Sequence, residues 1–295
     1  MSAGKPPDFF QLDKAGVRAA FDRASSSYEA AAVLQSRVAD ELLSRLEPFD
    51  FSPKVILDLG AGTGRVAAEL KRRYRGSMVI ALDLAPGMLR EAARHQRVFR
   101  RFERVCGDAA RLPLASASVD IVFSNLMLQW CDPLADAVAE VRRVLKPQGH
   151  FVFSTFGPDT LKELRSAWAE ADSHSHVNRF LDVHDVGDAL VRAGLLEPVL
   201  DVDRHLFTYD NAVTLMRDLK SIGARNETAG RPRTLLGRGH LQRVFTAYEA
   251  FRSDGRLPAT YEVVYGAAWG TAGRPAGAAH AGEVRISPSD IRRRK

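Results

Sequence analysis

The chain has 295 residues, of which 45% are hydrophobic and 26% are charged, a composition typical of a globular protein with a sizeable core. No apolar run approaches the ~20 residues that span a membrane, and the first fourteen residues lack the apolar stretch of a signal peptide. Six basic and two acidic side chains lie within residues 271–295, so most of the net charge of +6 belongs to that stretch. We therefore expect a cytoplasmic protein that binds neither membranes nor nucleic acid.

The cysteine content excludes two further classes of protein. Cys106 and Cys131 are too few for a disulfide framework, and neither has the spacing of metal ligands. We therefore expect no metal site.

A helical region is expected over residues 13–46, before the first strand. Phe21, Tyr28 and Gln35 follow one another at seven-residue steps, which would place them near one face of a helix. Two interpretations stay open. The region is either an amphipathic helix that covers the core or a lid whose Tyr28 closes over a bound ligand.

The most informative stretch is a short strand that runs straight into a glycine-rich turn. Residues 55–57 form the apolar run of a buried parallel strand, and Asp58 stands at its carboxyl end. Gly60, Gly62 and Gly64 then let the backbone turn tightly and approach a ligand that any Cβ would block. A helix is expected to follow. This arrangement predicts a small-molecule site at the end of the first strand.

Three further strands are also expected to end in small or polar residues. They span 78–82, 102–106 and 119–124, followed respectively by Asp83, by Asp108 with Ala109, and by Asn125. An acid after the second strand suits hydrogen bonding to ribose hydroxyls. Because the carboxyl ends of parallel strands meet at one edge of a sheet, these residues should line one crevice. We expect an adenosine-type cofactor there.

The spacing of the glycines separates this turn from other nucleotide sites. A dinucleotide-binding turn places its third glycine deeper in the helix. No Lys-Ser or Lys-Thr pair follows the glycines, which disfavours a phosphate-binding P-loop. With four polar strand ends in order, the chain resembles the class I S-adenosylmethionine-dependent methyltransferases. That resemblance implies S-adenosylmethionine as the cofactor.

The rest of the chain completes an α/β fold, a doubly wound and mostly parallel sheet of seven strands. A fifth strand at 150–156 is expected after a turn at 146–149, and the last two strands, at 198–207 and 260–269, are expected to pair antiparallel. Residues 208–259 are too long for a hairpin loop and carry helical periodicity, so they form an expected helical insertion over the crevice. We expect one domain over residues 1–270 and a basic, disordered tail over 271–295.

Basic residues are concentrated in two folded segments, 90–104 and 219–245. A solvated helix face is the plain interpretation of either segment. The second segment belongs to the insertion, and there a dock for an acidic partner is the sharper interpretation. Its candidate docking residues are Lys220, Arg225, Arg231 and Arg233.

Five segments carry a closer resemblance. They are FDRASSSYEAAAVLQSRVADELL from Phe21, SNLMLQWC at 124–131, NRFL at 178–181, LKSIGARN at 219–226 and GRLPATYEVVYG at 255–266. They resemble the malonyl-acyl-carrier-protein O-methyltransferases of biotin synthesis, and the resemblance includes the insertion. It implies methyl transfer from S-adenosylmethionine to the free carboxylate of a malonyl thioester, giving the methyl ester that starts pimeloyl and biotin synthesis.

The resemblance also implies partners and roles. The malonyl group would arrive on acyl carrier protein or on coenzyme A, and the sequence leaves that choice open. Two other functions stay open: methylation of another small carboxylate or a phenol, and a protein-modifying enzyme or assembly factor with the same fold. A carboxylate is ionised at neutral pH, so no general base is expected.

We assign candidate roles to the following residues. The expected cofactor residues are Asp58, Gly60, Gly62, Gly64, Asp83, Asp108, Ala109 and Asn125, and the expected substrate-orienting residues are Tyr28, Gln129 and Trp130. Structural roles compete with two of these assignments, since Gln129 can cap a helix and Trp130 can be a core aromatic.

Overall fold

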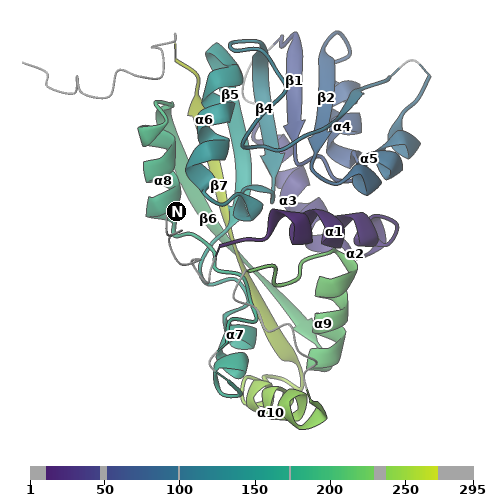
Figure 1. Cartoon of the computed structure of the whole chain (residues 1–295), viewed down its shortest axis with the longest axis vertical. Coiled ribbons are helices and arrows are strands. Elements are labelled where there is room, and N and C mark those ends of the chain that lie inside the picture. Colours follow the sequence, from purple (N-terminus) through teal and green to yellow (C-terminus); the bar gives the residue numbers. More distant parts are fainter. Residues whose placement is uncertain (1–10, 47–51, 99, 173, 229–236, 272–295) are drawn as a thin grey trace, which may run out of the picture.

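A single seven-stranded sheet forms the centre of the protein (Figure 1). The computed structural model describes residues 11–46, 52–98, 100–172, 174–228 and 237–271. The strands, given in their order across the sheet, are β3 (Glu103–Cys106), β2 (Met78–Asp83), β1 (Val55–Leu59), β4 (Val119–Asn125), β5 (Leu145–Phe156), β7 (Leu257–Trp269) and β6 (Leu196–Tyr209). The first five strands pair in parallel, and β7 runs antiparallel to β5 and β6. The predicted fold class is confirmed.

Helices cover both faces of the sheet. They are α3 (Val33–Ser44), α4 (Arg65–Arg73), α5 (Pro86–Ala92), α6 (Leu134–Val144) and α8 (Val183–Arg192). Ile56 packs into the hydrophobic cluster that includes α3 and α4, whereas its neighbour Leu57 packs into the cluster that includes α6 and α8. Successive side chains of a strand point to opposite faces, so an apolar strand creates two surfaces that helices must bury.

The N-terminal region forms three helices instead of one. They are α1 (Lys14–Ala24), α2 (Tyr28–Ala31) and α3. Asp13 caps α1 because its Oδ1 accepts the backbone N–H groups of Ala15 and Gly16, each at 3.1 Å. The breaks after Ala24 and at Ala32 place Phe21 and Tyr28 on different helices, so no single helix face carries the seven-residue pattern. In Figure 1, α1 crosses the carboxyl ends of the parallel strands.

The boundaries of β5 differ from the prediction. The residues predicted as a turn, 146–149, lie within β5, where the pairing with β4 shifts between Val119 and Ile121. Gln148 has a φ of 61°, so the local bend is absorbed as a bulge and the strand continues. The last two strands are also longer than predicted. The pairing between them extends from Leu196 to Tyr209 in β6 and from Leu257 to Trp269 in β7.

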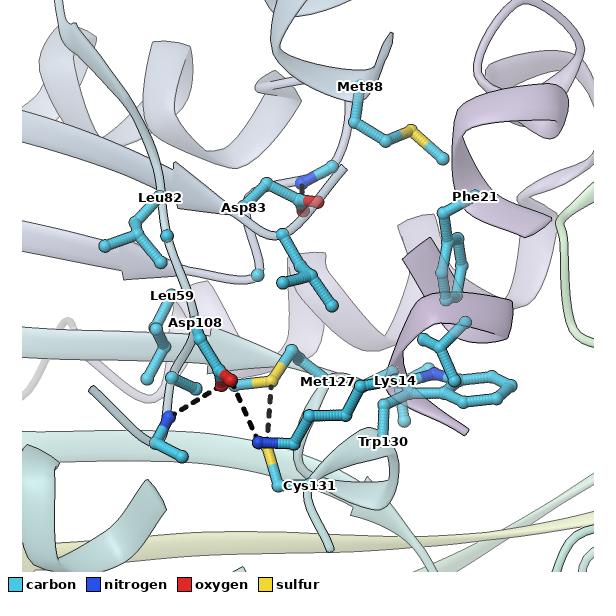
Figure 2. A pocket seen from close by; sticks show the side chains of 18 of the residues that line it. Lys14, Phe21, Leu59, Leu82, Asp83, Met88, Asp108, Met127, Trp130 and Cys131 are labelled. Carbon is cyan, nitrogen blue, oxygen red and sulfur yellow. Dashed lines mark hydrogen bonds and ion pairs between the residues drawn. The ribbon is translucent and has the colours of Figure 1, made fainter. Parts of the chain in front are cut away.

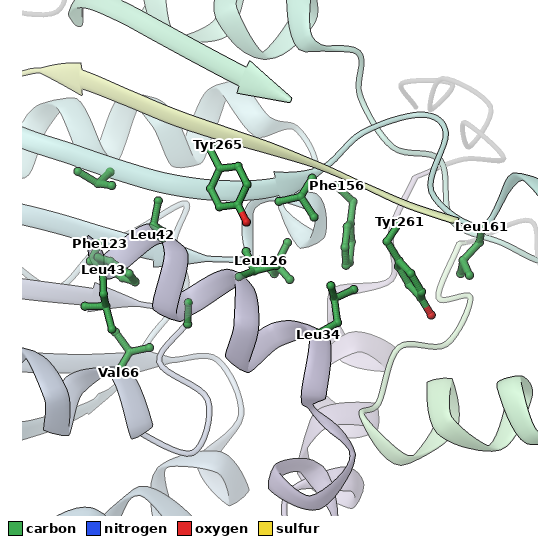
Figure 3. Close-up of a cluster of buried hydrophobic side chains, with 14 of the residues drawn as sticks. Leu34, Leu42, Leu43, Val66, Phe123, Leu126, Phe156, Leu161, Tyr261 and Tyr265 are labelled. Atoms are coloured by element: carbon green, nitrogen blue, oxygen red, sulfur yellow. The ribbon is translucent and has the colours of Figure 1, made fainter. Parts of the chain in front are cut away.

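The far ends of β6 and β7 carry a helical lobe, formed by α7 (Lys162–Ala169), α9 (Ala212–Ser221) and α10 (Arg238–Glu249). The predicted insertion is therefore helical over the part that the structure describes. Tyr248 of α10 is fully buried, and its hydroxyl donates to the carbonyl of Pro258 at 2.7 Å. The lobe shares one hydrophobic cluster with α3 and α4, and Figure 3 shows that cluster extending from Leu43 to Tyr261. No helix of the described residues is long and apolar enough to cross a membrane.

Gly266 of β7 provides a test of the side-chain packing between neighbouring strands on one face of the sheet. A Cβ there would overlap the ring of Phe153 on β5 and approach Cδ2 of Leu200 to 2.8 Å. We expect Gly266→Ala to lower the free energy of unfolding by about 1–3 kcal/mol, the usual cost of overpacking a core. Urea unfolding measures the change. Gly76→Ala is the matched control, because no atom of the described residues lies within 4 Å of the added Cβ. Equal stabilities for the two variants would contradict the packing argument.

Candidate active site

A mostly apolar cavity lies at the carboxyl ends of β1, β2 and β4, beneath α1 (Figure 2). It holds about 810 Å³ of space including its mouth, within the ~300–1,000 Å³ of typical small-molecule sites. We call it the main cavity. Six predicted cofactor residues line it: Gly60, Gly62, Asp83, Asp108, Ala109 and Asn125. A smaller side cavity next to it is lined by Asp58, by residues 60–63 and by Tyr28, Gln35 and Asn125.

The glycine turn holds the end of β1 against β2. The backbone N–H groups of Gly60 and Ala61 donate to the carbonyl of Leu82 at 2.8 and 3.0 Å. Gly62, at a φ of 53°, leaves its Cα side open toward the cavity. Gly64 lines neither cavity; a Cβ there would lie 2.7 Å from the Cβ of Ala92, so this glycine permits close packing of α4 against α5.

Two carboxylates of the main cavity are held by hydrogen bonds. Asp83 accepts the N–H groups of Gly62 and Ala85, each at 2.8 Å, and burial still raises its pKa to about 6. Asp108 accepts the ammonium of Lys14 and the N–H of Ala110, each at 2.9 Å. Partial burial alone would raise the pKa of Asp108, but these hydrogen bonds hold it below its usual value.

Asp58 is the exception among the carboxylates of the site. Its side chain is 2% exposed, and its Oδ2 has no hydrogen-bond partner among the described residues. Burial, followed by the negative charge of Asp83, raises the pKa of Asp58 to about 8. A buried carboxylate oxygen without a partner is costly, so the place of Asp58 on the side-cavity wall suits a ligand that brings a positive charge.

The three predicted substrate-orienting residues have different surroundings. Tyr28 is half-buried and lines both cavities, and burial together with Asp83 raises the pKa of its hydroxyl well above the ordinary value. Trp130 lines the main cavity and packs edge-on against Phe21, with ring centroids 5.2 Å apart. Gln129 lines neither cavity. Its amide donates to the carbonyl of Leu126 at 2.6 Å and accepts the hydroxyl of Thr155 at 3.2 Å.

Sequence reasoning missed several residues of the main cavity. Lys14 reaches the main cavity from α1. It pairs with Asp108, which is 94 residues away in the sequence, so no local motif indicates the pair. Met127 and Cys131 also line the main cavity, with Cys131 Sγ 3.4 Å from Met127 Sδ (Figure 2). Burial, then the charge of Asp108, raises the pKa of Cys131 to about 12, so this thiol is protonated and unsuited to nucleophilic attack.

The predicted docking residues are only partly described. Lys220 lies in the last turn of α9, and Arg225 follows that helix; both are exposed. Arg231 and Arg233 lie outside the described residues. In the same lobe, Asp172, His176 and His240 have potential metal-ligand atoms within 4.8 Å of one another. Their side chains pair through Asp172 Oδ2, at 2.9 Å from His176 and 2.7 Å from His240.

Comparison with known proteins first defines the class. Residues 57–153 match the family model of a methyltransferase domain. The fold is similar to that of the YcgJ protein of Bacillus subtilis, with a TM-score of 0.58 and 16% identity, covering 79% of this chain and 98% of that one. It is also similar to phosphoethanolamine N-methyltransferase 2 of Haemonchus contortus, solved with S-adenosyl-L-methionine: TM-score 0.53, 16% identity, 84% and 57% coverage. The chain has the class I methyltransferase fold.

Sequence relatives then define the family. The malonyl-acyl-carrier-protein O-methyltransferase of Methylovorus sp. is 54% identical, covering 89% of this chain and 90% of the relative. That of Halorhodospira halophila is 50% identical, covering 98% of this chain and 99% of the relative. The chain belongs to the malonyl-acyl-carrier-protein O-methyltransferase family. The second match also extends into residues 271–295, which the motif resemblance had left outside.

The pKa of Asp58 predicts how stability depends on pH. In the unfolded chain an aspartate loses its proton near pH ~3.9, whereas folded Asp58 keeps it up to about pH 8. The free energy of unfolding should therefore fall as pH rises from about 4 to about 8, and this contribution should then level off. We expect Asp58→Asn to remove that fall and to raise the Tm of the ligand-free protein at pH 8 by at least about 3 °C.

Asp120→Asn provides the matched control for this prediction. Lys146 Nζ and the N–H groups of Lys54 and Val55 bind this carboxylate and hold its pKa low against the effect of partial burial. We expect this variant to melt lower than the wild type at pH 8. Thermal melts of both variants between pH 5 and 9 measure the effect. A Tm of Asp58→Asn below the wild-type value at every pH would show that this buried carboxylate does not destabilise the fold.

Proposed function

We infer that this protein transfers a methyl group from S-adenosylmethionine to the free carboxylate of a malonyl thioester. Family membership over nine-tenths of the chain carries this conclusion. The product would be the malonyl methyl ester that starts pimeloyl and biotin synthesis. Methylation of another carboxylate or a phenol, and an assembly role, are not favoured, because the similarity extends through the insertion and the lobe.

The two cavities fit the proposed cofactor. Asp58 is the proposed partner of its ammonium group, because Oδ2 is buried on the side-cavity wall without a partner. The glycine turn and Asn125 would contact the methionine portion, since they line both cavities. Asp83 would bind the ribose hydroxyls, and Asp108 with Ala109 would contact the adenine. Gly64 supports this site through packing.

The chemistry needs alignment more than proton transfer. When bound, S-adenosylmethionine supplies a methyl group made electrophilic by its sulfonium. The malonyl carboxylate is ionised at neutral pH, so this chain has to hold it in line and exclude water. Tyr28 and Trp130 are the proposed orienting residues because both line the main cavity. Gln129 would act indirectly, by fixing the turn that carries Trp130.

We also propose that the malonyl group arrives on acyl carrier protein, with malonyl-CoA as the alternative. Lys220, Arg225, Arg231 and Arg233 are the proposed docking residues for that acidic partner. A cytoplasmic location belongs to the same proposal.

The reaction can be tested directly. The protein is incubated with labelled S-adenosylmethionine and either malonyl carrier protein or malonyl-CoA, and the acyl arm is examined by mass spectrometry. We expect the mass increase of one methylation on the malonyl group, with a higher kcat/KM for the carrier. Binding of S-adenosylmethionine without methylation of either substrate would overturn the proposed function.

Charge reversal tests the docking surface. We expect Arg231→Glu/Arg233→Glu to raise KM for malonyl carrier protein by about tenfold or more, since like charges repel an acidic partner. The Kd of S-adenosylmethionine should be unchanged. Arg97→Glu/Arg100→Glu makes the same charge change in the other basic segment and serves as the control. An equal loss with malonyl-CoA would show that these arginines do not act through the carrier.

A further inference from the structure

A second cavity lies beside the main one, and Trp130 lines both. We call it the outer cavity; it holds about 530 Å³ of space including its mouth. Its walls come from Gln35 and Trp130, from the end of β5, and from residues 160–164 and 176–180. The end of α9, residues 222–226 and β7 complete them. The principal apolar wall residues are Phe156, Leu161, Phe180, Leu219, Ile222 and Tyr261.

The charge on the walls of the outer cavity is of one sign. Among the described residues, no aspartate or glutamate lines it, whereas Arg225 does. Arg225 is also exposed, so this side chain stands at the mouth. Asn178 is 7% exposed and fixes the backbone that carries Arg225. Its Oδ1 accepts the N–H of Glu227 at 3.2 Å, and its Nδ2 lies 3.4 Å from the carbonyl oxygen of Arg225.

The outer cavity therefore combines a cationic mouth, mostly apolar walls and a junction with the main cavity at Trp130. A ligand that matches it is long, largely uncharged along its length, and anionic at its outer end. A malonyl thioester on a 4′-phosphopantetheine arm has this chemistry. Its phosphate is the outer anion, and its malonyl carboxylate is the group that must reach the main cavity.

We propose that the outer cavity binds the phosphopantetheine arm, with the phosphate at Arg225 and the malonyl end at Trp130. The inference rests on the proposed function, because it takes a malonyl thioester as the substrate. It separates two tasks within the lobe. The outer cavity recognises the arm, which acyl carrier protein and coenzyme A share. The other proposed docking residues, Lys220, Arg231 and Arg233, recognise the carrier protein.

The first test removes the phosphate-binding charge. Arg225→Gln is compared with the wild type on malonyl-phosphopantetheine and on malonyl-pantetheine, which lacks the phosphate. We expect KM for the phosphorylated substrate to rise about tenfold or more, because a charge-assisted contact is lost. KM for malonyl-pantetheine should stay within twofold. Arg217→Gln is the matched control, since Arg217 is an exposed arginine of the preceding helix that does not line the cavity.

The second test fills the cavity. Ala224 lines it and is partly exposed, so Ala224→Trp should obstruct the arm without entering the main cavity. We expect kcat/KM to fall at least tenfold for malonyl-CoA and malonyl carrier protein alike, with an unchanged Kd of S-adenosylmethionine by calorimetry. The unchanged Kd also establishes that the variant is folded.

The outcomes separate this inference from the function on which it rests. If the wild type methylates malonyl thioesters but Arg225→Gln affects both pantetheine substrates equally, the arm does not bind here and the reaction stands. If Ala224→Trp impairs only the carrier-bound substrate, the surface belongs to the carrier protein and the proposal fails. If the wild type methylates none of these substrates, the proposed function itself fails.

Discussion

The burial of carboxylates at one edge of the sheet is the constraint on which the rest of the site depends. Parallel strands bring Asp58 and Asp83 to the same edge, where water is largely excluded. Asp83 is compensated by two backbone N–H groups, one of them from the glycine turn. Asp58 has one oxygen without a described partner. The fold therefore contains a buried carboxylate oxygen that a positive charge would stabilise. The ammonium group of the cofactor is the partner that we propose for it.

The N-terminal helices turn this edge into an enclosed site. Lys14 on α1 binds Asp108 across the main cavity, and Tyr28 on α2 closes it near Gly62. The break between α1 and α2 lets the two helices present these side chains from different directions. Residues of α1 and α2 line the main cavity, and a lid that closes over a bound ligand stays a prediction. Part of the same region, α3, is packed in the core.

Two titratable side chains of the main cavity are held in their neutral forms. Cys131 is held protonated by burial and by Asp108, and Tyr28 is held neutral. The pKa of Asp58 is about 8, but Asp58 lines the side cavity and not the main cavity, which holds the proposed orienting residues. Transfer to an ionised carboxylate depends on alignment and exclusion of water, which a wall of Trp130, Phe21 and Tyr28 can provide. The main cavity and the outer cavity meet at Trp130, which gives that alignment a structural basis.

The sequence by itself determined the sheet, its mostly parallel order, the glycine turn and the acids at the strand ends. These are local patterns, set by the alternation of side chains along a strand and by the need for glycine at positive φ. It also brought six of the predicted cofactor residues to one cavity, because parallel strands bring their carboxyl ends together. Only the tertiary structure decided that Gly64 packs against Ala92, that Gln129 binds Leu126, that Lys14 reaches Asp108 and that an outer cavity meets the main one at Trp130. Such contacts join residues distant in the chain, and they follow from packing that no local pattern records.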